Sequence, residues 1–170
     1  MNGPEIEELL ALFPGEPLAV SVVPADALPE PYRNLLVHEH HMTVTVEAHY
    51  RGPVDVRVLQ SRRENSHYSR EILLIHRSTH KVVQSGIVRI DLSLTSPEVR
   101  EEILAERTPL GRILIDRGVM RRVHPTAYLR IEPGNRTEEW FGQRAVCYGR
   151  LAVLVLDERP AIEVLEVVAP

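Results

Sequence analysis

Two charged residues lie inside apolar, strand-like segments of the sequence. Arg70 is followed by Glu71 and the run ILLI, and Glu166 lies in EVLEVV near the C-terminus. An uncompensated charge on a buried strand is costly, so each side chain must point to solvent, to an oppositely charged partner, or into a polar pocket. A charge inside a pocket can bind a ligand of opposite charge. The residues alone slightly favour the simpler interpretation, in which both charges lie on an exposed sheet face.

Three histidines form the segment VHEHH, at positions His38, His40 and His41. On an extended strand, His38 and His40 share one face and His41 points to the other, so two of them could converge on a metal ion. No set of cysteine, histidine and carboxylate partners follows at the spacing of zinc sites. The sequence therefore favours exposed histidines at the entrance of a strand, and no metal site is predicted.

Motifs for two other common chemistries are missing from the sequence. The serines Ser66, Ser69 and Ser85 have no GxSxG turn around them. The nine glycines are scattered and form no phosphate-binding loop. Hydrolysis by an activated serine and binding of a nucleotide are therefore not predicted.

The composition indicates one globular domain over residues 1–170, with 44% hydrophobic and 26% charged residues. No apolar run approaches the roughly 20 residues of a membrane-spanning helix, and the acidic start of the chain does not resemble a secretory signal. A cytoplasmic protein without a membrane span is expected. The single cysteine, Cys147, allows no internal disulfide.

The charged residues point to a small anionic partner rather than to nucleic acid. The formal net charge is −4, which gives no general attraction for a polyanion. Of the 20 basic residues, all but Lys81 are arginine. Arginine binds carboxylates through two parallel hydrogen bonds, so some of these residues are candidates for holding an anionic ligand, while most are expected to be surface charge.

Hydrophobic periodicity predicts a few helices and several hairpins. Helices are expected over residues 5–13, for a turn or two within 31–40, and over 97–107 after a cap at Ser96. Strands are expected over 42–50, 54–60, 68–76, 82–93, 144–156 and 161–170, with a turn-rich loop over 132–142. This order predicts an α+β fold, in which helices cover one face of a single antiparallel sheet.

Several segments resemble the chorismate lyase family, the chorismate–pyruvate lyases that act as 4-hydroxybenzoate synthases in ubiquinone biosynthesis. The segment HMT at 41–43 is similar to the family's Ser-Met-Thr, and YSREILL at 68–74 is similar to its Arg-Glu-Ile-Leu-Leu strand. SPEVREEILAERTPLGRILI at 96–115 resembles its helix followed by Thr-Pro-Leu-Gly-Arg. The resemblance continues in Tyr148-Gly149-Arg150 and the closing strand, and covers residues 33–170. It implies a six-stranded antiparallel sheet with a buried site beneath flap-like helical segments.

The resemblance also implies roles for individual residues. Arg70 matches the arginine that holds the ring carboxylate, and Leu110 matches the residue whose backbone amide meets the same carboxylate. Glu166 matches the glutamate that hydrogen-bonds the hydroxyl at the far end of the ring, with Glu163 as the alternative alignment. The position of HMT places Met42 and Thr43 near the pocket.

One further family arginine, at the end of Gly-Arg-Thr, has no counterpart in the stretch QSGIVRID. Arg89 lies further along this stretch and replaces it only if the strand register differs.

The implied activity is elimination of pyruvate from chorismate to give 4-hydroxybenzoate, without a metal or organic cofactor. Two alternatives remain open. One is a non-catalytic module that binds a small aromatic acid, like the lyase-like effector domains of transcription regulators. The other is a related lyase that acts on a different enol-pyruvyl acid.

Overall fold

The computed structural model describes residues 3–119 and 121–170, and its centre is one antiparallel sheet of seven strands. The strand order is β1-β5-β6-β7-β4-β3-β2, and every neighbouring pair is antiparallel. The strands are β1 (Val20–Val23), β2 (Val54–Glu64), β3 (His67–His76), β4 (Val82–Asp91), β5 (Arg121–Ile131), β6 (Cys147–Leu156) and β7 (Arg159–Val168). The α+β prediction with a single antiparallel sheet is confirmed. The sheet has one strand more than expected, because β1 and β5 were not among the predicted strands and one predicted strand, over residues 42–50, is absent from the sheet.

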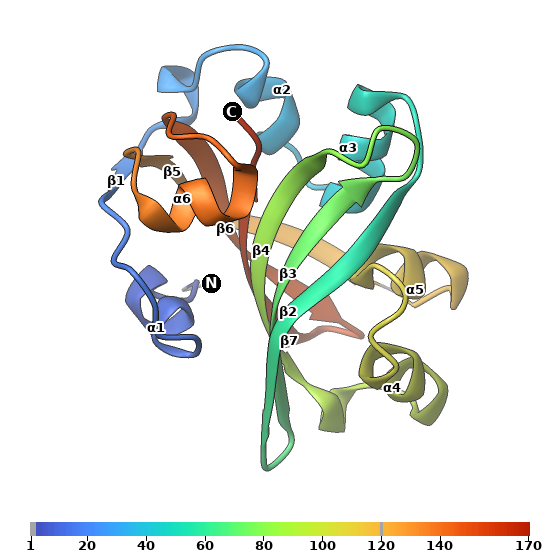
Figure 1. Cartoon of the computed structure of the whole chain (residues 1–170). Helices are drawn as coiled ribbons and strands as arrows, with labels where there is room; N and C mark the ends of the chain where they lie inside the picture. Colours follow the sequence, from blue (N-terminus) through green and yellow to red (C-terminus); the bar gives the residue numbers. More distant parts are fainter. Residues whose placement is uncertain (1–2, 120) are drawn as a thin grey trace.

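Helices cover both faces of the sheet, not one face as predicted (Figure 1). On one face, α1 (Ile6–Ala11) and α6 (Asn135–Phe141) bury Leu9 and Trp140 against the central strands. On the other face lie α2 (Tyr32–Leu36), α3 (Met42–Tyr50), α4 (Pro97–Leu104) and α5 (Leu110–Asp116). The reason is the composition of β3, β4, β6 and β7, which carry mostly apolar side chains on both faces and therefore need a cover on each side.

The predicted strand over residues 42–50 is wrong, because this segment is the helix α3. Its alternating valines and threonines favour a strand locally, but Met42, Thr43 and Val46 share one helical face and are buried. Packing of that face against Leu36 and the sheet outweighs the local preference. The helix ends at Arg51, which has a left-handed φ of 57°. As a result, β2 pairs with β3 and not with residues 42–50.

The predicted loop over 132–142 contains the helix α6. Its start is closed by Thr137, whose hydroxyl accepts from the Gly134 amide at 3.0 Å and donates to the Gly134 carbonyl at 2.9 Å. Gly142 ends it in a left-handed conformation, with a φ of 72°. Because Trp140 is buried, the helix is stabilised by tertiary packing that the polar sequence does not reveal.

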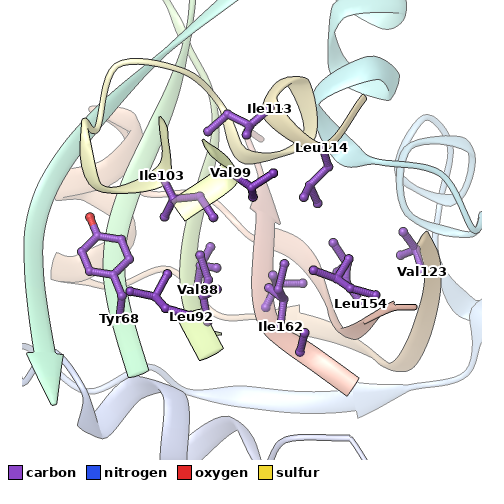
Figure 2. Packing of buried hydrophobic residues seen from close by; sticks show 14 of the residues in the cluster. Tyr68, Val88, Leu92, Val99, Ile103, Ile113, Leu114, Val123, Leu154 and Ile162 are labelled. Atoms are coloured by element: carbon purple, nitrogen blue, oxygen red, sulfur yellow. The ribbon is translucent and has the colours of Figure 1, made fainter. Parts of the chain in front are cut away.

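Two helices, α4 and α5, cover the sheet next to the candidate site, and the start of α5 borders it. The Ser96 hydroxyl caps α4 by accepting from the Val99 amide at 3.2 Å, as predicted. Figure 2 shows Val99 and Ile103 of α4 above the sheet residues Val88 and Ile162. This packing fixes the position of the segment between α4 and α5. None of the helices in the described residues is long and apolar enough to cross a membrane.

Candidate functional site

A cavity lies between the sheet and the segments that begin α3 and α5. About 500 Å³ between its walls is not filled by protein atoms, part of it open to solvent, and about 50 Å³ is available to the centres of water molecules. All five predicted site residues line it: Met42, Thr43, Arg70, Leu110 and Glu166. The structure thus brings together side chains that are up to 124 positions apart, from Met42 to Glu166.

The sheet forms the floor of the cavity through alternate residues of three neighbouring strands. Arg70 of β3 lies opposite Val88 of β4, and the next row of the same face joins Ile72, Gly86 and Glu166. Gly86 leaves room above the centre of this row. A Cβ atom there would lie 3.1 Å from the backbone oxygen of Leu165, closer than most real contacts.

Arg70 is a buried cation that faces this space. Its side chain is among the largest fully buried ones, with 1% of the residue exposed. Its Nε and Nη1 atoms are buried without a hydrogen-bond partner among the residues that the structure describes. Burial lowers the pKa of Arg70, while Tyr68 and then Glu106 oppose this shift. An arginine retains its proton even so, and the N–H groups of these two unpartnered nitrogens can therefore bind an anion.

The segment between α4 and α5 is tied to β3 beside Arg70. The Tyr68 hydroxyl donates a hydrogen bond to Glu106 Oε1. Burial, reinforced by this hydrogen bond, raises the pKa of Tyr68 to about 12. Leu110 follows as the first residue of α5, where helix geometry leaves a backbone N–H without an intrahelical acceptor. The Tyr68–Glu106 contact therefore fastens the start of the segment that leads to Leu110, and Gly111, the next residue, packs closely against His41 and Thr43.

The opposite end contains Glu166 and a second buried arginine, Arg150. Arg150 Nε donates to Glu166 Oε2 at 2.7 Å. Its Nη1 donates to the carbonyls of Leu36 at 3.1 Å and His38 at 2.8 Å, and its Nη2 donates to the His40 carbonyl at 3.1 Å. Arg150 therefore holds the Glu166 carboxylate and fastens the α2–α3 connection to the sheet.

The three histidines lie in this connection, which leads into the helix α3 and not into a strand as predicted. The predicted exposure is right for His40, whereas His38 is half-buried and His41 is buried. His41 is buried, lines the cavity, and accepts a hydrogen bond at Nε2 from Arg121. Burial, with Arg121 and Arg150 nearby, lowers the pKa of His41 to about 4, so its ring is neutral near pH 7. Burial and Arg150 also lower the pKa of His38. In residues 3–119 and 121–170, no group of three or more histidine, cysteine or acidic side chains is arranged to hold a metal ion.

Two alternative residues are placed on the opposite face of the sheet. Glu163 is three positions from Glu166, so strand alternation turns it away from the cavity. It forms an ion pair with Arg89, whose Nε lies 2.5 Å from Glu163 Oε2. Glu166 is therefore the glutamate that lines the cavity, and neither Glu163 nor Arg89 faces it.

Two polar residues that line the cavity, Gln84 and His41, were not among the predicted site residues, nor was Arg150, which hydrogen-bonds the lining residue Glu166. Arg150 carries the same signal as Arg70, a charge within an apolar strand, here before LAVLVL. Gln84 gives no comparable signal, because a glutamine at a strand position is compatible with either face. The role of His41 depends on burial, which the polar segment VHEHH does not indicate.

The comparisons with known proteins give no match: neither a family model nor a curated protein is similar to this chain. The functional assignment therefore depends on the motif resemblance and on the geometry of the cavity. The most informative features are a buried cation with unused donors at one end and a paired carboxylate at the other.

Proposed function

We propose that this protein binds a small ring-shaped carboxylic acid in the cavity and acts as a lyase of the chorismate type, releasing pyruvate and 4-hydroxybenzoate. One observation carries this proposal: Arg70, Leu110 and Glu166, which the resemblance links to one ligand, line one cavity. The separation of the two charges also fits, because Arg70 and Glu166 lie in neighbouring rows of the same sheet face, two strands apart.

The elimination of pyruvate requires the protein to position the substrate more than to activate a nucleophile. The ether bond between ring and enolpyruvyl group breaks, the neighbouring ring carbon loses its hydrogen as a proton, and the enol takes up a proton to become pyruvate. Aromatisation of the ring drives the reaction. Arg70 and the Leu110 amide would hold the ring carboxylate, and Glu166 would accept a hydrogen bond from the hydroxyl on the ring carbon that loses its proton.

A second candidate, a binding module for an aromatic monocarboxylic acid, is favoured by the state of the other arginines. Chorismate carries two carboxylates, and a dry site needs a donor set for each. Arg150 already donates to four acceptors in the described chain, and Arg89 faces the other side of the sheet. Of these three arginines, Arg70 alone has donors at the cavity that are unpartnered within the described residues. One such arginine is enough for a ligand with one carboxylate.

Incubation of the purified protein with chorismate distinguishes the candidates. We expect 4-hydroxybenzoate and pyruvate to form in equal amounts, and Arg70→Ala to lower the rate about 100-fold, as expected for loss of charge-assisted hydrogen bonds. Arg89→Ala is the matched control, since it removes an arginine from the opposite face. Binding of 4-hydroxybenzoate without turnover would support the binding module. Absence of both turnover and binding would refute both candidates.

A further inference from the structure

Gln84 of β4 is a buried polar side chain on the cavity wall with no assigned role. It is 4% exposed, and its Oε1 atom has no hydrogen-bond partner in the described part of the chain. Its Nε2 atom lies 3.8 Å from the position that a Cβ atom on Gly86 would occupy. The amide therefore extends along β4 over the glycine, toward the row that contains Glu166.

The burial of the Gln84 amide oxygen is unfavourable unless another group donates a hydrogen bond to it. A buried amide oxygen without a partner has lost its hydrogen bonds to water and gained none from the protein. The side chains beside it in the cavity include Ile72 and Leu74, which are apolar and offer no hydrogen bond. Because Gln84 lines the cavity, a bound ligand is in a position to supply the missing partner.

The sheet register places Gln84 at the end of the cavity opposite Arg70. Gln84 pairs with Leu74 on one side and Val168 on the other, two rows of the same face away from the Arg70–Val88 pair. It is the diagonal neighbour of Glu166, and such neighbours lie about 7–8 Å apart between Cα atoms. Two long polar side chains at this separation can contact the same ligand substituent.

We infer that Gln84 is a specificity-determining residue that hydrogen-bonds the polar substituent of the ligand opposite its carboxylate. This inference rests on the proposed binding of a ring carboxylic acid, and it adds a second side chain, besides Glu166, that contacts the hydroxyl at the far end of the ring. The hydroxyl has one proton: donated to the Glu166 carboxylate, it leaves the hydroxyl oxygen free to accept from the Gln84 amide nitrogen, and donated to Gln84 Oε1, it supplies the partner that this atom lacks among the described residues. An unsubstituted ring acid leaves both groups unpaired and binds more weakly.

Calorimetric titration with 4-hydroxybenzoate and with benzoate tests the inference. We expect the unaltered protein to bind 4-hydroxybenzoate at least about 10-fold more tightly, and Gln84→Met to reduce this ratio about 5- to 10-fold, the worth of one hydrogen bond. Benzoate affinity should be unchanged or higher in Gln84→Met. Ser85→Ala is the matched control: Ser85 is the next residue of β4, its hydroxyl is also buried and unpartnered within the described residues, but it faces the other side.

The outcomes separate this inference from the proposed function. An unchanged ratio in Gln84→Met, with binding abolished in Arg70→Ala, would overturn the role of Gln84 and leave the proposed function standing. Failure of the unaltered protein to bind either acid would overturn both. The midpoint of urea unfolding should stay equal or rise in Gln84→Met, because an unpartnered polar group is removed. A clear fall would show that the amide stabilises the fold and would overturn the inference.

Discussion

Arg70 and Arg150 are almost equally buried on the same face of the same sheet, yet they differ in how many of their nitrogen atoms have hydrogen-bond partners. Arg150 is 0% exposed, and its three nitrogens donate to one carboxylate and three backbone carbonyls. Arg70 is 1% exposed, and two of its nitrogens have no partner in residues 3–119 and 121–170. Burial alone therefore does not distinguish a structural arginine from a candidate ligand-binding one; the number of satisfied donors does.

The neighbour of Arg70 on β3 shows the same contrast across the sheet. Glu71 points to the opposite face and is buried, but both of its oxygens are partnered. Oε1 accepts from Trp140 at 3.0 Å and Arg136 at 3.3 Å, and Oε2 accepts from Gln60 at 2.8 Å. The two adjacent charged residues therefore differ in role. Glu71 links α6 to the sheet by hydrogen bonds, whereas Nε and Nη1 of Arg70 are left available to a ligand.

The largest effect is expected at the satisfied arginine. Arg150→Met should destabilise the protein by about 3–5 kcal/mol, because it leaves the Glu166 carboxylate unpaired in a largely buried position and frees three carbonyls. The difference in free energy of unfolding can be measured by urea denaturation. A loss below about 1 kcal/mol would show that water replaces these hydrogen bonds and would remove the contrast with Arg70.

A pH effect of intermediate size is expected at the same end of the cavity. The pKa of His41 is lowered from 6.5 to about 4 in the folded protein. Between these pH values, His41 is therefore protonated in the unfolded chain and neutral in the folded protein. Stability is therefore complete above pH 6.5 and decreases as the pH falls toward 4, by up to about 3 kcal/mol.

Urea unfolding between pH 4 and 7 measures this slope. His41→Gln retains an acceptor for Arg121 but does not titrate, so its stability should depend less on pH over this range. Equal slopes for the two proteins would contradict the assigned burial of a neutral His41.

The smallest change in stability is expected at the unsatisfied arginine. Arg70→Met should leave the free energy of unfolding unchanged or raise it by up to about 1 kcal/mol, because a buried charge without full pairing is removed. Urea denaturation of both methionine variants in parallel gives the comparison directly. A loss similar to that of Arg150→Met would show that Arg70 stabilises the fold and is not reserved for a ligand.

Much of the site could be predicted from local sequence, because strands alternate with period two. Arg70 and Glu166 lie at correctly predicted strand positions, and their placement on one face follows once the register is known. The helix after Ser96 was also predicted, since its cap is a local interaction. Residues 42–50 were not, because their strand-like alternation is outweighed by packing of one helical face.

The sequence by itself determined that charged side chains stand among apolar strand residues in an α+β protein, because these patterns depend on neighbours along the chain. The tertiary structure alone decided which of these charges are paired. Arg150 meets the α2–α3 connection and Glu166, whereas Arg70 and Gln84 meet a cavity. Partners for buried polar groups come from segments distant in sequence, and the packing of helices over both faces of the sheet determines where those segments lie.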